Sequence, residues 1–293
     1  MKLIDNSFNE IENNLDNLNN TINSINTYIK LNLGEDVLKD VDIDDALIQI
    51  SNDGEYSIRM HNGNIKTLPM RDSSGAFKTN MIISVDKEKL SITPGIVLRP
   101  NFNTHQFIHE YLHVLSSKKD NYLDELGITY TKTGTKIDYY DKNLDDSNYY
   151  QKISAEGLNE GITEMLATKI DNKYTGNYAP FVVASELLSY DNDLLLKAYF
   201  SHDTKELIDF YNDLESKQST ITREDIINLS SKETNEEVIK KIVKGSIEYG
   251  LSNSKNKDEF LNYTSNKLKQ LDNSYILDSG SWSELLNLSD KTM

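Results

Sequence analysis

Cysteine is absent from the 293 residues of this chain, and proline is scarce, with 4 residues. The missing thiols exclude a disulfide framework, a thiol nucleophile and any metal site built on thiolates. No run of 18 consecutive apolar residues occurs, so the sequence predicts no membrane insertion. The start of the chain also lacks the apolar segment of a secretory signal, and we expect a cytoplasmic protein or one exported by a non-classical route.

Basic residues are fewer than acidic ones. The chain has 31 Lys and Arg residues and 47 Asp and Glu residues, which gives a formal net charge of −16. Binding to nucleic acid depends on neutralising phosphates with basic side chains, so we expect no nucleic-acid partner. The length and the 37% hydrophobic content are those of a globular protein with a substantial core.

Apolar residues recur with spacings of four and three over the first 30 residues. The positions are Ile4, Phe8, Ile11, Leu15, Leu18, Ile22, Ile25 and Ile29. This heptad seam predicts an amphipathic helix within residues 1–34, which ends where Leu33-Gly34 breaks the pattern. Two interpretations stay open: the helix packs along its own domain, or it self-associates or binds a partner through residues 4–29. We favour the first. Abundant Asn lowers helix propensity, so the helix needs a packing partner in either case.

Residues 35–293 are expected to form one domain of α+β class with two lobes. A β-containing lobe covers about 35–150, and its strand candidates are 56–60, 81–85 and 95–98. Pro94 is expected to interrupt or begin the last of these strands.

A helix is predicted over 104–116, with Asn103 or Thr104 as its N-cap. A β-hairpin should follow it, with a turn at 132–135. The second lobe, about 151–293, has a helical pattern throughout, and its predicted breaks are 171–172, 191–193, 201–203 and 279–280.

One pentapeptide carries a specific chemistry: His109-Glu110-Tyr111-Leu112-His113. Residues four apart lie on one face of a helix, so the two imidazoles can bind one Zn²⁺ from the same side. Glu110 lies one step around the helix, where it can reach a metal-bound water without being a ligand. This arrangement is typical of metallopeptidases, with Glu110 as general base.

Zinc in such a site needs a third protein ligand, and the remaining histidines, His61, His105 and His202, are poorly placed to supply it. Glu156, Glu160 and Glu164 recur every four residues in the segment 155–167. Stacked carboxylates repel one another, and buried ones need a compensating charge such as a metal. Helical spacing separates the three only weakly, and each stays a candidate ligand.

The two motifs together resemble the gluzincin metallopeptidases, the thermolysin and aminopeptidase type. The resemblance rests on residues 104–117 and 155–170, in particular on Leu158-Asn159-Glu160-Gly161. It implies that Glu160 is the third zinc ligand and that Glu164 occupies the position that orients a ligand histidine. Glu160 follows His113 by 47 positions, much farther than in thermolysin-like chains and closer to lethal-factor-like and clostridial-neurotoxin-like members.

The resemblance also implies a second donor to the oxyanion, commonly Tyr, His or Arg. We favour Tyr178, which follows the predicted third-ligand helix in a loop, over Tyr150 and Tyr149, which precede that helix. The sequence therefore predicts a zinc metallopeptidase, with residues 35–293 as its catalytic domain and a peptide or protein as its substrate.

Two other classes of function remain in view. One is a catalytically inactive zinc-binding protein that acts through a partner bound by its N-terminal helix. The other is a coiled-coil structural protein in which the histidine motif is accidental and binds no zinc.

Overall fold

The computed structural model describes residues 2–10, 16–34, 47–51, 54–60, 62–70, 75–86, 89–99, 101–118, 120–122, 128–141, 152–217 and 219–289. It contains both helices and strands, which confirms the mixed class predicted from the sequence. The chain divides into two compact units, Met1–Ile153 and Ser154–Met293.

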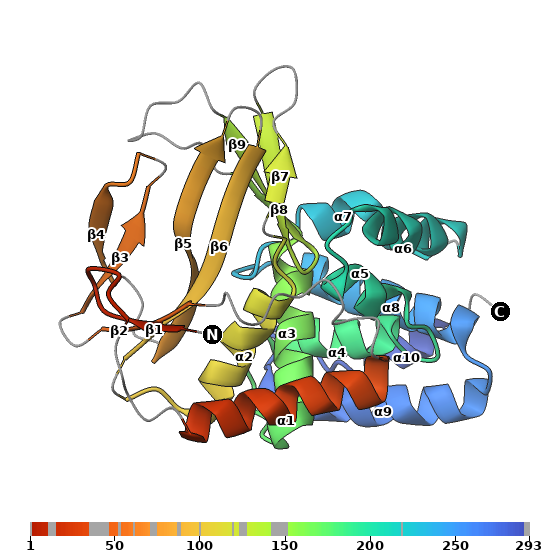
Figure 1. Ribbon diagram of the computed structural model, residues 1–293. Coiled ribbons are helices and arrows are strands. Elements are labelled where there is room, and N and C mark those ends of the chain that lie inside the picture. The colour runs from red at the N-terminus through yellow and green to blue at the C-terminus, as the bar shows by residue number, and fades with distance from the viewer. Residues whose placement is uncertain are drawn as a thin grey trace. The chain divides into compact units, whose positions relative to one another are not determined.

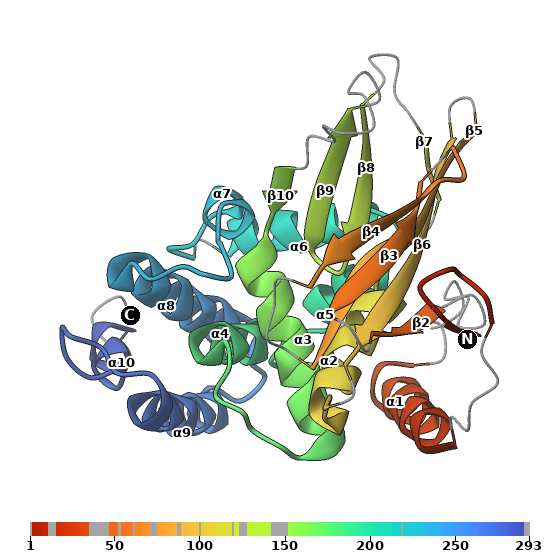
Figure 2. The same ribbon diagram turned by 90° about the vertical axis from the view of Figure 1, so that its left-hand side faces the viewer.

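The first unit is built on a mixed sheet whose long central strands are β5 (Ala76–Asp86) and β6 (Lys89–Leu98), which run antiparallel (Figures 1 and 2). The strand order is β1-β2-β6-β5-β3-β4, and β7 pairs with β6. The bounds of these shorter strands are β1 (Lys2–Ile4), β2 (Leu47–Ile50), β3 (Glu55–Arg59), β4 (Ile65–Pro69) and β7 (Asp120–Tyr122).

The expectation that Pro94 interrupts or begins a strand is wrong, because β6 passes through it. Pro94 pairs with Asn80 and the next pair joins Thr93 to Ile82, so Met81 is an extra residue on β5. Such a bulge disrupts the hydrogen-bond ladder locally and accommodates a residue that has no N–H. The Met81 side chain is fully buried and forms a core cluster with other apolar residues, namely Ile4, Leu47 and Val97.

The predicted N-terminal helix begins later than its heptad seam indicated. Ile4 lies in β1, which pairs in parallel with β2, and α1 spans Asp16–Leu33. The Asp5 carboxylate accepts hydrogen bonds from the N–H groups of Ser7 and Asn9, a side-chain turn that competes with helix formation. The seam positions Ile11 and Leu15 lie outside the described residues.

The apolar face of α1 is covered within the chain. Ile25 and Ile29 are fully buried, Ile22 is nearly so, and α1 contacts α2. This burial favours a helix packed on its own protein, because an exposed seam is what a coiled-coil partner would need. Self-association through residues 4–29 stays a prediction.

Helix α2 (Thr104–Leu115) matches the helix predicted over 104–116, and Asn103 is its N-cap. Both views show α2 beside one end of β5 and β6, which it contacts (Figures 1 and 2). The predicted hairpin is confirmed, with β8 (Ile128–Thr133) and β9 (Lys136–Asp141) joined through Gly134, whose φ is 61°. Strand β10 (Lys152–Ser154) extends this small sheet in the order β10-β9-β8.

The second unit is helical, as the sequence predicts. Its helices are α3 (Glu156–Asp171), α4 (Ala179–Leu188), α5 (Leu194–Phe200), α6 (Lys205–Ser216), α7 (Arg223–Ile227), α8 (Glu236–Asn253), α9 (Lys257–Ser274) and α10 (Glu284–Ser289). Three of the four predicted breaks fall between helices, and the break at 171–172 coincides with the end of α3, whose last residue is Asp171. Helix α4 contacts α3, α8 and α9 (Figure 2). The Trp282 side chain is fully buried. Within the part of the chain that the structure describes, no helix is long and apolar enough to cross a membrane.

Candidate metal centre

Helix α2 begins with a complete capping box, which fixes the start of the helix that carries the histidine motif. The Asn103 side chain accepts from the N–H of Gln106 at 2.9 Å, and the Gln106 side chain accepts from the N–H of Asn103 at 3.3 Å. Two of the N–H groups that a helix leaves unpaired at its start are thereby satisfied.

His109 and His113 lie on one face of α2, as their spacing predicts. Their side chains are buried, at 8% and 6% exposure, and their ring centroids are 5.0 Å apart at an interplanar angle of 74°. The two rings are therefore close enough for one nitrogen of each to bind the same ion. His105, one turn earlier, is also buried but is not part of this pair, and His61 lies outside the described residues.

Glu110 points to the neighbouring sheet. Its carboxylate accepts a hydrogen bond of 2.6 Å from the backbone N–H of Lys78 on β5, and it stays partly exposed. A backbone donor on a paired strand holds the carboxylate in one orientation. This partner of Glu110 could not be predicted from the sequence, because Lys78 donates from its main chain.

Helix α3 begins in an unusual way, with Ala155 in the left-handed region at φ 57°. The end of α7 and the residues just after it accept hydrogen bonds from the start of α3, because the N–H of the N-cap Ala155 donates to the Ile227 carbonyl and that of Gly157 to the Leu229 carbonyl. The start of α3 is therefore fixed by a segment about seventy residues away in the sequence.

The three glutamates of α3 have different partners. Glu156 accepts a hydrogen bond from the N–H of Ser231 at 3.3 Å, and Glu164, only 3% exposed, accepts one from the Thr175 hydroxyl. Glu160 is the carboxylate that joins the histidines. One ligand atom from each of His109, His113 and Glu160 lies within 4.8 Å of the other two, and this group could hold a metal ion.

The donor set of this group fits a divalent transition metal. Two imidazole nitrogens and one carboxylate oxygen are a ligand combination that zinc takes in catalytic sites, with the fourth position open. Hard cations such as Ca²⁺ and Mg²⁺ prefer oxygen ligands alone. The donor types are therefore compatible with the zinc that the sequence predicts.

Tyr178 is the N-cap residue of α4 and has a left-handed backbone, with φ 52°. Such a conformation is rare for a large side chain and is found where the surrounding structure enforces it. The loop before it is attached to α3, because Thr175 donates to Glu164 and the N–H of Asn177 donates to the Thr175 hydroxyl. The alternative residues, Tyr149 and Tyr150, lie outside the described residues.

Close packing explains the glycine that follows Glu160. A Cβ added to Gly161 would lie 2.5 Å from the Phe181 carbonyl oxygen on α4. We expect Gly161→Ala to force α3 and α4 apart and to lower the free energy of unfolding by about 2 kcal/mol, as overpacking does.

Chemical denaturation of the purified variant measures this effect. A suitable control is Asn262→Ala at an exposed position of α9, where a surface substitution should change stability by less than about 0.5 kcal/mol. Equal stability of the two variants would contradict the close-packing role of Gly161.

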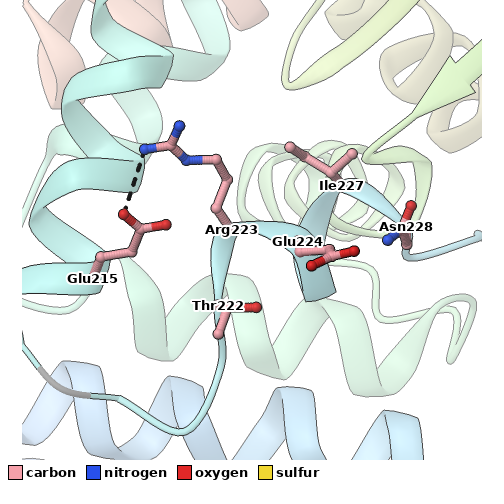
Figure 3. Close-up of a pocket in the computed structure, with 6 residues that line it drawn as sticks. All are labelled: Glu215, Thr222, Arg223, Glu224, Ile227 and Asn228. Atoms are coloured by element: carbon pink, nitrogen blue, oxygen red, sulfur yellow. Dashed lines mark hydrogen bonds and ion pairs between the residues drawn. The ribbon is translucent and has the colours of Figure 1, made fainter.

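An open depression of about 490 Å³ lies in the second unit and contains none of the predicted site residues (Figure 3). It is lined by Glu215, Thr222, Arg223, Glu224, Ile227 and Asn228. The charge of Arg223 is already paired, because its guanidinium lies 3.4 Å from Glu215. We assign no role in the metal centre to this depression.

Comparison of the chain with protein-family models, with curated proteins and with solved structures gives no match in any of the three.

Proposed function

We propose that this protein is a zinc-dependent peptidase of gluzincin type that cleaves peptide bonds within a peptide or protein substrate. The observation that carries the proposal is the group of His109, His113 and Glu160, with Glu110 next to the first of them. A site that only bound zinc would have no need of Glu110, whereas hydrolysis requires a base at this position.

Zinc bound by these three residues would supply a Lewis acid and a water of lowered pKa. Glu110 is the group that accepts a proton from the attacking water on its carboxylate and later returns it to the leaving amine. The hydrogen bond from Lys78 keeps this carboxylate in place, and the second carboxylate oxygen is the one we assign to proton transfer.

Tyr178 is proposed to donate its phenol hydrogen to the substrate oxygen on which negative charge develops. A donor that is already oriented lowers the barrier, since it need not reorganise during the reaction. The link between Thr175 and Glu164 would hold the loop of Tyr178 on α3 for this purpose.

A library of peptides blocked at both ends tests the proposal, because only an endopeptidase cleaves chains without free termini. We expect cleavage by the purified protein, loss of cleavage after zinc is removed with a chelator, and recovery when zinc is added back. Cleavage that is insensitive to the chelator would refute zinc dependence. Bound zinc with no cleavage of any library would favour the alternative, an inactive zinc-binding protein.

A further inference from the structure

The last turn of α2, which carries His113, includes the ordinary helical bond from the Ser116 N–H to the Leu112 carbonyl, but the next bond is not helical. In a continuing helix the carbonyl of His113 would accept from the N–H of Ser117. Here that N–H donates instead to the Val114 carbonyl, at 3.1 Å. Two hydroxyls reach the His113 carbonyl in its place, Ser117 at 2.6 Å and Ser116 at 3.2 Å.

The Ser117 hydroxyl belongs to a chain of polar groups that extends to β5. Ser117 Oγ lies 3.1 Å from Thr133 Oγ1 at the end of β8, and Lys78 Nζ donates to the same Thr133 oxygen at 3.1 Å. Ser117 and Thr133 are both 5% exposed, so water has little access to these hydroxyls. We call Lys78 Nζ, Thr133 Oγ1 and Ser117 Oγ the hydroxyl relay.

The number of hydrogens on each group determines the direction of every hydrogen bond in the relay. A carbonyl can only accept and an ammonium can only donate, and each hydroxyl has one hydrogen. Ser117 gives its hydrogen to the His113 carbonyl, so Thr133 must donate to Ser117 and accept from Lys78. The relay therefore directs the positive charge of Lys78 toward the C-terminal end of α2, where a cation is favourable.

Lys78 is thus linked to the motif helix in two ways, directly through its backbone and indirectly through the relay. Its Nζ begins the relay to His113, and its backbone N–H binds the Glu110 carboxylate. The hairpin is attached to the same end of α2 by main-chain bonds, from Gly134 N–H to the Ser116 carbonyl and from Lys118 N–H to the Lys132 carbonyl. These bonds keep Thr133 within reach of Ser117.

We propose that Lys78, Thr133 and Ser117 are positioning residues that hold the His113 turn of α2 in the geometry required for metal binding. This inference rests on the proposed function, because it assigns the relay a role toward the zinc ligands. Loss of a partner that orients a metal ligand lowers metal affinity by about 10- to 100-fold.

The test compares variants that remove one group of the relay at a time. Thr133→Val and Lys78→Met remove a hydroxyl and an ammonium with little change in volume, and Thr133→Ser keeps the hydroxyl. Thr131→Val is the matched control, since Thr131 lies on the same face of β8, is 4% exposed and makes none of the relay bonds. Zinc affinity is measured by competition with a chelator, and the absorption spectrum of bound Co²⁺ reports the ligand geometry.

We expect about 10-fold weaker zinc binding and a shifted Co²⁺ spectrum in Thr133→Val and in Lys78→Met, and wild-type values in Thr133→Ser and Thr131→Val. The double variant Lys78→Met with Thr133→Val should be no weaker than either single one, because residues of one network are not additive. Should Thr133→Val fail to fold, Lys78→Met carries the comparison.

Equal affinities in Thr133→Val and Thr131→Val, or multiplied losses in the double variant, would overturn the relay while leaving the zinc site intact. A wild-type protein that binds neither Zn²⁺ nor Co²⁺ would refute the proposed function itself, and the relay's role with it.

Discussion

Replacing Glu160 with alanine should empty the zinc site, lowering the zinc content from about one ion per chain to almost none. Two imidazoles alone offer too few protein ligands and leave the charge of the ion unbalanced. Elemental analysis of the purified protein measures the zinc content directly, and circular dichroism shows whether the variant is folded. No substrate is needed, so this result is independent of any activity screen.

Glu156→Ala is the matched control for this variant. Glu156 lies one turn earlier on the same helix, but its carboxylate accepts from the N–H of Ser231. We expect Glu156→Ala to keep its zinc. Zinc retained in Glu160→Ala but lost from Glu164→Ala would move the third ligand to Glu164, and zinc absent from the wild type would refute the metal centre.

Replacing Glu110 with glutamine should separate zinc binding from catalysis. Glutamine has nearly the same shape, and its amide oxygen can still accept from the N–H of Lys78, so the helix and its histidines should stay in place. An amide cannot take a proton from water at neutral pH. We therefore expect unchanged zinc content and a loss of peptide cleavage of about 1,000-fold, within the range for general acid–base groups.

The measurement is the rate of cleavage of the best library peptide, with the zinc content of each preparation as the internal control. Glu156→Gln makes the same chemical change away from the histidine motif and should cleave at the wild-type rate. Wild-type cleavage by Glu110→Gln would contradict the role of Glu110, and the activity would then have to come from another group or a contaminating protease.

Local features of the chain were predictable where they depend on residues that are close together in the sequence. The capping residue Asn103, the apolar face of α2 and the turn at Gly134 are all read from neighbours within a few positions. The pairing of His109 with His113 follows from helical spacing alone, and the ring separation of 5.0 Å agrees with it.

Two local predictions were wrong because a distant or competing bond prevailed. Helical periodicity extended to Ile4, but the Asp5 side chain forms a turn and β2 supplies a pairing partner for β1. The strand around Pro94 continues because the neighbouring strand β5 forms a bulge at Met81. Met81 is distant from Pro94 in the sequence, so the sequence around the proline does not reveal the bulge.

The amino-acid sequence alone specifies the chemistry available to this protein: no thiols, two histidines one helical turn apart, and a helix with three carboxylates at equal spacing. The differences among those carboxylates arise in the folded chain. Glu156 is bonded by Ser231 and Glu164 by Thr175, while Glu160 lies with the histidines. The relay from Lys78 to His113 was likewise invisible in the sequence, because its members come from β5, β8 and the end of α2. Spacing along a helix specifies which side chains share a face of that helix. The groups that bond to those side chains come from elsewhere in the chain, and such hydrogen bonds form only when the chain folds.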